Sequence, residues 1–373
     1  MTGQILITGA DGYLGRRIAA RLLVETGDRL LLTVRADDRA ELTAKGNALQ
    51  RELRRFGSDG RIRVAAADLR RREPFAAIDP RRVTAVVHTA ARTAFNVERS
   101  TAQAVNVDGT ARVAGFARDC PKLERLLVLS TVFSSGRRTG VIPEAPHDAD
   151  GGFVNHYEWS KNAAEHQLLT DSADLPLTIA RLTTIVADDD TGAVTQYNVF
   201  HRTLKLFFYG LLSLMPGDPA TSQSLATAEF SSRGAAHLLR PEIPAGIYHL
   251  APAPAETLPL EEVLDIAFDV FDADPGFRRR RLLRPSYCDL ESFRDLAEAS
   301  KSLSVSPMAQ AIGSVAPFAE QMFLNKEFDN SRLREVWPDC PSTDPRRLVA
   351  ATCAHLVGTR WGRHTTSPAA AGN

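Results

Sequence analysis

Short apolar runs alternate with helical patterns along the first half of the chain. Residues 4–8 form an apolar run that is typical of a buried strand, and Ile18, Leu22 and Leu23 then recur at helical spacing. The same alternation continues through apolar runs at 30–34, 61–66, 83–88 and 126–129 and helical patterns at 40–55 and 100–118. Strands that alternate with helices predict an α/β fold, with a doubly wound parallel sheet and right-handed crossovers.

Beyond Arg181 the regular alternation fades. An apolar and aromatic stripe predicts a helix over 196–215, and the stripe suits either a plain core or the lining of a channel for an acyl chain. A strand is predicted near 246–250, a helix at 259–271 and mostly helical structure over 277–361. We therefore expect a nucleotide-binding domain at 1–190 and a smaller, mostly helical substrate-binding region at 191–363. The strand near 246–250 returns to the first domain, and the Ala/Thr/Ser/Pro-rich residues 364–373 are expected to form a disordered tail.

Three glycines occupy the turn between the first strand and the first helix. Gly9, Gly12 and Gly15 allow a tight turn, close approach of the backbone to a pyrophosphate, and close packing of the helix on the strand. The helix then directs its N-terminal amides at the phosphates. The sequence predicts a dinucleotide site at this turn, formed by the glycines together with Asp11, Tyr13 and Leu14.

Small and polar residues also follow the later strands. The ligand of a doubly wound sheet lies at the carboxyl ends of the strands, so residues there are candidates for contact with the dinucleotide. These candidates are Arg35, Asp68, Leu69, Thr89, Ala90, Ala91, Ser130 and Thr131.

Arg35 bears on the choice between the two nicotinamide dinucleotides. It stands where a site for NAD commonly has an acidic residue that bonds the ribose 2′-hydroxyl, and a cation there suits a 2′-phosphate. We therefore predict NADP(H). The alternative is that Arg35 only ends the strand and that Asp37 or Asp38 recognises the ribose.

Tyr157 and Lys161 are spaced four apart, which places them one turn from each other on one face of a helix. A nearby cation favours the phenolate, so we expect Lys161 to depress the pKa of Tyr157 and make it a general acid at neutral pH. Such a pair also occurs on ordinary solvated helix faces. The pattern of the surrounding strands favours the catalytic interpretation.

Composition excludes several other classes of protein. Lys+Arg and Asp+Glu are both 45, so the net charge is zero, which argues against a nucleic-acid binder. The longest uncharged apolar run, 206–217, is too short to span a bilayer. The cysteines Cys120, Cys288, Cys340 and Cys353 lack metal-ligand spacing, so no metal site is expected. With a strand that starts directly after Met1, these features predict a cytoplasmic protein.

Taken together, these motifs resemble the extended short-chain dehydrogenase/reductases. The shared features are Thr-Gly-x-x-Gly-x-x-Gly, Asp-Leu, His-x-Ala-Ala, Asn-x-x-Gly-Thr, a Ser-Thr after a strand, and Tyr-x-x-Ser-Lys, within about the first 200 residues. The resemblance implies a Rossmann-type fold and a catalytic group of Thr131, Tyr157 and Lys161. Tyr157 would be the acid, Lys161 would also hold the nicotinamide ribose, and Asn106 would mainly fix local geometry.

Finer features are similar to those of thioester reductases and fatty acyl reductases. They are Val-Arg-Ala at Arg35, the segments 139–144 and 153–158, and Thr191-Gly192, although Leu182 replaces the proline that usually follows the arginine of the sixth strand. This similarity implies NADPH-dependent reduction of an acyl thioester, bound to coenzyme A or a carrier protein, to an aldehyde or alcohol. It also implies that a homodimer through paired helices would be common for such an enzyme.

Two other activities stay open at this point. One keeps the chemistry but changes the substrate to a ketone, an alcohol or, by epimerisation, a sugar nucleotide. The other is a redox sensor that holds NADP without turnover, against which the Tyr157 and Lys161 pair argues. Dehydratases of the same fold carry acidic residues after the catalytic threonine, where Val132 and Phe133 stand here, so that activity is excluded. The run Arg278 to Arg281, with Arg284, is either a solvated face or a docking patch for an acidic carrier protein.

Overall fold

The computed structural model describes residues 3–57, 60–301 and 307–363, so the predicted tail at 364–373 lies outside the described residues. The chain separates into two compact units. Unit 1 comprises Met1–Thr183, Ala228–Ala251 and Phe328–Pro341, and unit 2 comprises Thr184–Thr227, Pro252–Glu327 and Ser342–Asn373. The division into domains at 1–190 and 191–363 stays a prediction.

Unit 1 is built on a seven-stranded sheet in the order β12-β7-β5-β4-β1-β2-β3. Every neighbouring pair in it is parallel, which confirms the predicted α/β, Rossmann-type sheet. The strand order reverses between β1 and β4, and such a switch point is where ligands bind in this architecture. The strands are β1 (Gln4–Thr8), β2 (Arg29–Val34), β3 (Ile62–Ala66), β4 (Val83–His88), β5 (Arg125–Thr131), β7 (Leu177–Leu182) and β12 (Gly246–Leu250).

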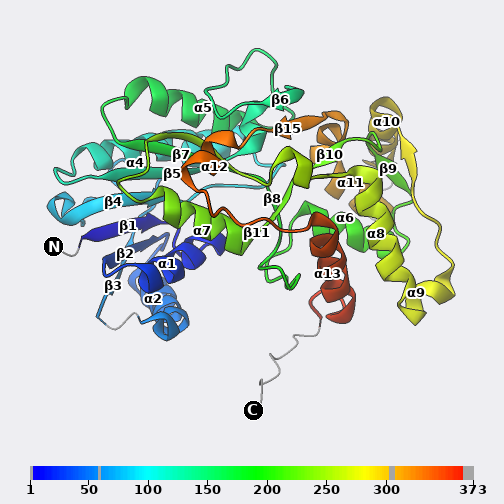
Figure 1. The fold of residues 1–373 in the computed structure, drawn as a ribbon, viewed down its shortest axis with the longest axis horizontal. Helices are drawn as coiled ribbons and strands as arrows, with labels where there is room; N and C mark the ends of the chain where they lie inside the picture. The colour runs from blue at the N-terminus through cyan, green and yellow to red at the C-terminus, as the bar shows by residue number, and fades with distance from the viewer. Residues whose placement is uncertain (1–2, 58–59, 302–306, 364–373) are drawn as a thin grey trace. The chain divides into compact units, whose positions relative to one another are not determined.

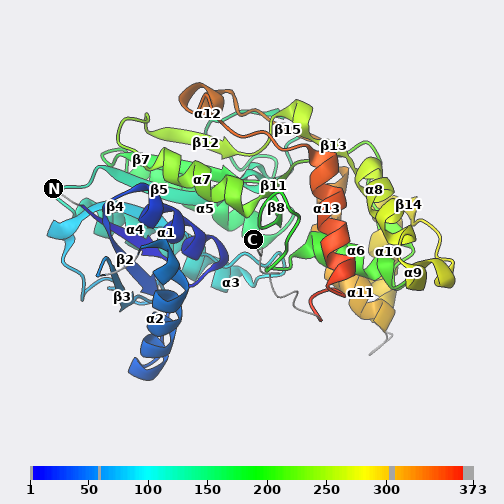
Figure 2. The ribbon, with the colours of Figure 1, turned by 60° about the horizontal axis from the view of Figure 1, so that its bottom comes forward.

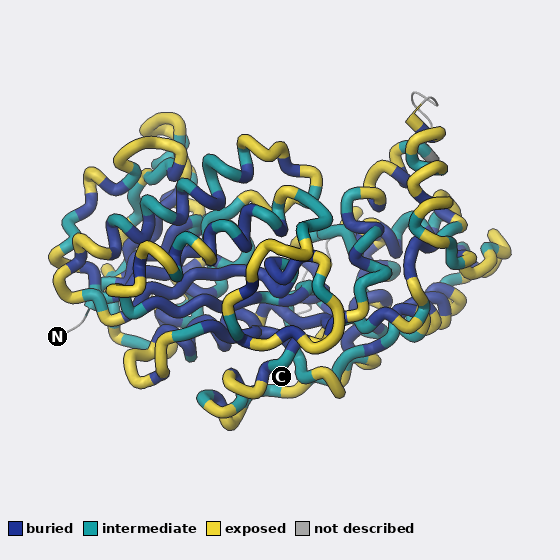
Figure 3. The backbone as a smooth tube through the Cα atoms, turned by 90° about the horizontal axis from the view of Figure 1, so that it is seen from above, coloured by how far each residue is buried: buried dark blue, intermediate teal, exposed yellow. Residues whose placement is uncertain are grey.

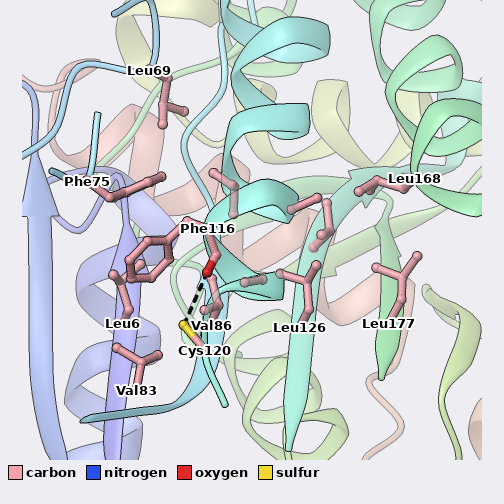
Figure 4. Packing of buried hydrophobic residues seen from close by; sticks show 14 of the residues in the cluster. Leu6, Leu69, Phe75, Val83, Val86, Phe116, Cys120, Leu126, Leu168 and Leu177 are labelled. Atoms are coloured by element: carbon pink, nitrogen blue, oxygen red, sulfur yellow. Dashed lines mark hydrogen bonds between the residues drawn. The ribbon is translucent and has the colours of Figure 1, made fainter. Parts of the chain in front are cut away.

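Helices cover both faces of this sheet (Figure 1). One layer consists of α1 (Tyr13–Glu25), α2 (Arg39–Leu53) and α7 (Ala228–Leu238), and the other of α4 (Asp108–Arg118) and α5 (His156–Asp171). Apart from β3, whose residues are partly buried or exposed, the strands between the layers are buried along most of their length (Figure 3). On the α4 side, Phe75 and Phe116 lie 4.8 Å apart between ring centroids. Figure 4 shows them packed with Leu6, Val86 and Leu126 of three neighbouring strands.

The helix predicted over 100–118 is interrupted. It consists of α3 (Arg99–Ala102), a π-helical turn η3 (Gln103–Val107) and then α4. A π-turn inserts one extra residue into a helix and often marks a functional site. Here it holds Asn106, one of the predicted site residues.

Unit 2 has a helical core with short two-stranded pairs beside it. Its longer helices are α6 (Val199–Phe208), α8 (Leu260–Asp272), α10 (Leu290–Lys301), α11 (Pro307–Val315) and α13 (Pro345–Gly358). α13 packs along α8, as Figure 2 shows. Aromatic rings fill the space among these helices, with Phe208, Phe271 and Phe277 each less than 6 Å from the other two between centroids. The buried Leu204, Phe207 and Phe208 of α6 are therefore core residues.

The helix predicted over 196–215 is too long. α6 ends at Phe208, and strand β9 (Leu214–Pro216) pairs in parallel with β14 (Ser286–Cys288). Gly210 has φ +70°, a left-handed conformation that ends a helix, and a Cβ there would lie 2.7 Å from Leu282. The apolar spacing continued past this residue and concealed the end of the helix.

Within residues 3–57, 60–301 and 307–363, no helix has the length and apolar character needed to cross a membrane. The same residues contain no group of three or more His, Cys, Asp or Glu side chains suited to hold a metal ion.

Candidate functional site

The glycine turn has the geometry that a pyrophosphate requires. Gly9 adopts φ +64°, and a Cβ there would lie 2.8 Å from the Ala90 Cα. A Cβ on Gly15 would lie 2.4 Å from the Gly9 carbonyl oxygen. Gly12, the N-cap of α1, donates its N–H to that same oxygen at 2.9 Å. The turn thus tolerates only glycine at two positions, and α1 starts at Tyr13 and Leu14 without an acidic side chain in its first turn, so its amides suit an anion.

Basic side chains lie at the ends of β2 and β3. Arg35 is exposed, and the Lys45 ammonium of α2 donates to its carbonyl oxygen at 2.6 Å. Lys45 also lies 3.5 Å from Asp11 Oδ2, so it joins the glycine turn to the end of β2. Asp68 pairs with Arg70 at 2.6 Å, and this hydrogen bond, opposed by partial burial, lowers the pKa of Asp68 to about 2. Arg35 is close enough to contribute to that lowering.

Asp38 is occupied elsewhere. Its carboxylate caps α2 by accepting the Glu41 N–H at 2.8 Å. Asp37 contributes its backbone N–H to Glu41 at 2.8 Å. The Asp38 carboxylate is thus committed to the helix cap, whereas the side chains of Arg35 and Asp37 are both exposed at the end of β2.

A buried hydrogen-bonded chain joins the ends of β1 and β4. Thr8 Oγ1 accepts the N–H groups of Thr89 and Ala90 at 3.2 and 3.3 Å, and lies 2.7 Å from His88 Nδ1. His88 Nε2 lies 3.0 Å from Thr110 Oγ1, whose own proton goes to the Asn106 carbonyl at 2.6 Å. His88 therefore donates from Nε2 and accepts at Nδ1, which is the neutral ring. Burial, with a smaller effect of Lys161, lowers the pKa of His88 to about 3.

The side chain of Asn106 connects the loop after β4 to the helix that carries Tyr157. Asn106 Oδ1 accepts the Arg92 N–H at 2.7 Å, and its Nδ2 donates to the Arg92 carbonyl and to Ser160 Oγ, both at 2.9 Å. Ser160 in turn donates to the Tyr157 carbonyl at 2.8 Å. Each hydrogen-bonding group of the buried amide is thus used for structure. These contacts suit the role of fixing local geometry, which stays a prediction for Asn106.

The last three residues of β5 each form a hydrogen bond to a different turn of α5. The Thr131 hydroxyl hydrogen-bonds the Tyr157 phenol, and the Lys161 ammonium donates to the Leu129 carbonyl at 2.8 Å. The Ser130 hydroxyl donates to Glu165, one further turn along the helix. Thr131 also contacts the Leu182 carbonyl and the Phe133 N–H, both at 3.3 Å. Thr131 and Tyr157 therefore bond to each other at the carboxyl end of β5, and Lys161, one helical turn after Tyr157, bonds the same strand at Leu129.

The direction of the Tyr157 pKa shift differs from the prediction. Burial raises the pKa of Tyr157 to about 12, and the hydrogen bond from Thr131 opposes that rise. Burial also lowers the pKa of Lys161 to about 8, which Glu165 opposes. The prediction that Lys161 depresses the phenol's pKa was wrong for this structure: desolvation dominates, and the carboxylates of Glu158 and Glu165 add to the rise. Its consequence is that the phenol keeps its proton at neutral pH.

Aromatic rings account for part of this burial. Phe95, from the loop after β4, lies edge-on to Tyr157 with 5.8 Å between centroids. It also lies 6.1 Å from Phe133, which follows Thr131. The surroundings of the phenol are thus apolar. No carboxylate occupies Val132 or Phe133, where a dehydratase would need one.

The other predicted residues have mainly structural contacts. Leu69 is buried in the hydrophobic cluster of Figure 4, and its carbonyl accepts from Arg112 at 2.9 Å. Ala91 is partly buried beside the Thr89 and Ala90 turn. Contact of these residues with a dinucleotide stays a prediction.

Sequence reasoning missed Lys45, Glu165 and Arg181. Glu165 and Arg181 form a buried ion pair at 2.7 Å between α5 and β7. The signal available in the sequence was a glutamate four residues after Lys161, on the same helical face. Lys45 was concealed within the polar pattern of α2.

The comparisons with known proteins agree with this geometry. The model of the family described as "Male sterility protein" matches residues 7–233, more than half of the chain. "Isonitrile lipopeptide synthase" of Streptomyces coeruleorubidus is 31% identical over 219 residues, which are 54% of this chain and 14% of that protein. "Probable fatty acyl-CoA reductase 5" of Arabidopsis thaliana is 27% identical over 168 residues, 38% of this chain and 33% of that protein. The chain therefore spans a third or less of these curated relatives.

The fold itself recurs in solved structures. The "terminal R domain from the myxalamid PKS-NRPS biosynthetic pathway" superposes with a TM-score of 0.75 over 96% of this chain and 91% of that one, at 21% identity. The glycine turn and the groups at the end of β5 thus lie on a fold that this R domain shares. The chain belongs to the male sterility protein family, within the extended short-chain dehydrogenase/reductases, and is an oxidoreductase.

Proposed function

We propose that this chain uses NADPH to reduce an acyl thioester to an aldehyde. The observation that carries the proposal is the meeting of Thr131, Tyr157 and Lys161 at the end of β5, in the same unit as the glycine turn. The names of the relatives, an isonitrile lipopeptide synthase and a fatty acyl-CoA reductase, support an acyl substrate. The rings of Phe95 and Phe133 beside the phenol suit an apolar acyl group.

The residues at the site fit a nicotinamide dinucleotide. The glycine turn and the start of α1 would hold its pyrophosphate, because a Cβ at Gly9 or Gly15 would meet backbone atoms and the helix amides face that turn. When bound, the nicotinamide supplies the hydride. Arg35 and Lys45, with its ammonium 2.6 Å from the Arg35 carbonyl, would hold the 2′-phosphate that distinguishes NADPH from NADH.

The side chains then supply the proton. As hydride adds to the carbonyl carbon, the C=O bond becomes a C–O bond, and Tyr157 gives the oxygen its phenolic proton while Thr131 hydrogen-bonds the same centre. A phenol with a pKa of about 12 carries that proton at neutral pH, as the role of general acid in reduction requires. The charge on Lys161 stabilises the phenolate that is left. The hemithioacetal then loses its thiol as the C–S bond breaks, which yields the aldehyde.

The substrate donor is proposed to be a carrier protein or coenzyme A. Within unit 2, Arg278 and Arg280 are anchored, by bonds to the Asp272 carbonyl at 2.8 and 3.1 Å and by the Phe208 ring at 4.7 Å. Arg279 and Arg281 are exposed, and Leu283, two residues further along the chain, is 89% exposed. Reversing Arg279 and Arg281 to glutamate should lower turnover of a carrier-bound acyl group and spare a small free thioester. Equal effects on both substrates would reject docking there.

Oxidation of NADPH against a panel of acyl thioesters, aldehydes and ketones tests the function. We expect turnover with acyl thioesters of apolar chains and release of one thiol per aldehyde formed. Turnover with ketones or sugar nucleotides alone would overturn the thioester proposal and leave the hydride chemistry in place. Binding of NADPH without turnover of any carbonyl compound would favour a sensor.

A further inference from the structure

The bonds between β5 and α5 extend beyond the groups assigned to the reaction. Thr131, Leu129 and Ser130 contact Tyr157, Lys161 and Glu165, which are spaced four apart along α5. Glu165 thus holds the third of three successive helical turns against the strand. Its side chain is 4% exposed and that of its partner Arg181 is 0% exposed. Charges so deeply buried require partners, and these have them.

Arg181 ties the pair to two further elements of unit 1. It donates to Glu165 through Nε and Nη2, at 3.1 and 2.7 Å, and through Nη1 to His147 Nε2 at 2.7 Å. His249 Nδ1 lies 2.7 Å from the Asp329 carbonyl, so its Nδ1 donates and its Nε2 accepts from Arg181 at 3.3 Å. Both imidazoles are neutral in this arrangement. Burial, helped by Arg181, lowers the pKa of His147 to about 4 and of His249 to about 3.

Glu165 is the carboxylate that acts on Lys161. Lys161 is 3% exposed, and its ammonium donates a hydrogen bond to the Leu129 carbonyl rather than to an acid. The titratable side chains around it are Tyr157 and Glu165 of α5 and His88 of β4, with Arg181 of β7 and His147 behind Glu165. Of these groups, Glu165 is the one that opposes the effect of burial on Lys161.

We propose that Glu165 is a positioning residue for the reaction proposed above, on which this inference rests. Its carboxylate, fixed by Ser130 and Arg181, holds α5 in register on β5 and supplies the negative charge that keeps the Lys161 ammonium protonated inside the protein. Lys161 then presents a cation beside Tyr157 at neutral pH. Without Glu165 the amine loses its proton at a lower pH, and the phenolate formed in the reaction loses its stabilising charge.

The direct test is the titration of Lys161 in cofactor-free protein. The chain has six lysines, so [ε-¹³C]lysine labelling gives few signals, and loss of one in Lys161→Arg assigns it. In the wild type we expect Lys161 to titrate with a pKa of about 8. In Glu165→Gln we expect that pKa to fall by about one unit or more, the usual effect of losing an adjacent opposite charge.

Two further variants protect this test from a folding defect. Glu165→Gln leaves Arg181 buried without its carboxylate, which is destabilising. The double variant Glu165→Gln with Arg181→Met removes both buried charges, which proteins often tolerate, and should show the same lowered pKa. Glu144→Gln is the matched control, because Glu144 is also 3% exposed but bonds the N–H groups of His249, Arg332 and Leu333. It should leave Lys161 unchanged.

The pH profile of reduction gives the second readout. Activity should decline as pH rises through the pKa of Lys161, and the decline should begin about one unit lower in the double variant. An unchanged Lys161 titration in both folded variants would overturn the inference, whatever the substrate panel shows. A shifted titration in a chain that reduces no thioester would instead reject the proposed function and keep the role of Glu165.

Discussion

Units 1 and 2 bury different kinds of side chain. Unit 1 encloses an ion pair, a lysine and three neutral histidines, each with defined hydrogen-bond partners. Unit 2 encloses stacked and edge-on aromatic rings whose contacts depend on volume. A buried polar group needs one particular partner, whereas a ring accepts many neighbours of suitable size. We infer that the sequence of unit 1 is more tightly specified.

The largest effect on stability is expected in the aromatic core. Phe271 is 0% exposed and lies within 5.2 to 6.2 Å of the rings of Phe208, Phe268, Phe277 and Trp361. Phe271→Ala should lower the free energy of unfolding by about 3–5 kcal/mol, through lost burial and the cavity left behind. Urea denaturation measures it. Dinucleotide affinity of the folded protein should change less than about twofold, because the candidate site lies in unit 1; a larger loss would contradict the separation drawn here.

Tyr157→Phe should give the largest loss of activity. The variant removes the transferable proton and the bond to Thr131, so turnover should fall at least about 10²-fold. Steady-state NADPH oxidation with a thioester measures it. Tyr248→Phe is the matched control: this tyrosine is also in unit 1, and its hydroxyl donates to the Pro244 carbonyl at 2.7 Å. Near-wild-type turnover of Tyr157→Phe would remove Tyr157 from the mechanism.

The features that the sequence predicted correctly lie mainly in unit 1, and the one it misplaced, the end of α6, lies in unit 2. The glycine turn was predictable because Gly9 and Gly15 act locally, through a left-handed φ and a close approach that a short motif records. The sheet was predictable from its buried apolar runs. The end of α6 was not, because Gly210 looked like one tolerated glycine in a long apolar stripe.

Other features depended on contacts that a pattern does not contain. The partnership of Glu165 with Arg181 and Ser130 arises from the register of α5 on β5 and β7. The sign of the Tyr157 pKa shift depends on how much water the fold removes, through Phe95 and other neighbours, and not on the spacing to Lys161. Both the Glu165 partnership and the Tyr157 pKa shift belong to unit 1. Even where short motifs specify the sequence tightly, the pKa values of the site therefore depend on the folded structure.

A smaller effect is expected at the dinucleotide end of unit 1. Arg35→Ser should raise the Michaelis constant for NADPH roughly tenfold, the size of one lost charge-assisted bond, and leave that for NADH nearly unchanged. Lys45→Met should act in the same direction. Arg82→Ser, which removes an exposed arginine before β4, is the control. A clear preference of the wild type for NADH would contradict the proposed cofactor.

The smallest expected effect is a difference between the two units in how much stability each loses in mild acid. Burial lowers the pKa of His88 to about 3, His147 to about 4 and His249 to about 3 in unit 1, and of His201 to about 4 in unit 2. Each native imidazole binds fewer protons than its unfolded form below about pH 6.5, so stability is lost as pH falls through that range. Glu144 acts oppositely, because burial raises its pKa to about 7 and protonation then favours the native state.

In unit 1, three of these histidines therefore destabilise the native state in mild acid and Glu144 opposes them. In unit 2, His201 alone of these groups has the destabilising effect. Unit 1 should lose about 1 kcal/mol more than unit 2 per pH unit between pH 6 and 5. Hydrogen exchange, compared as protection factors at pH 7 and 5, resolves the two units. His147→Gln should reduce the acid sensitivity of unit 1 alone. Earlier loss of protection in unit 2 would show that its aromatic core, and not the buried polar groups, limits stability in acid.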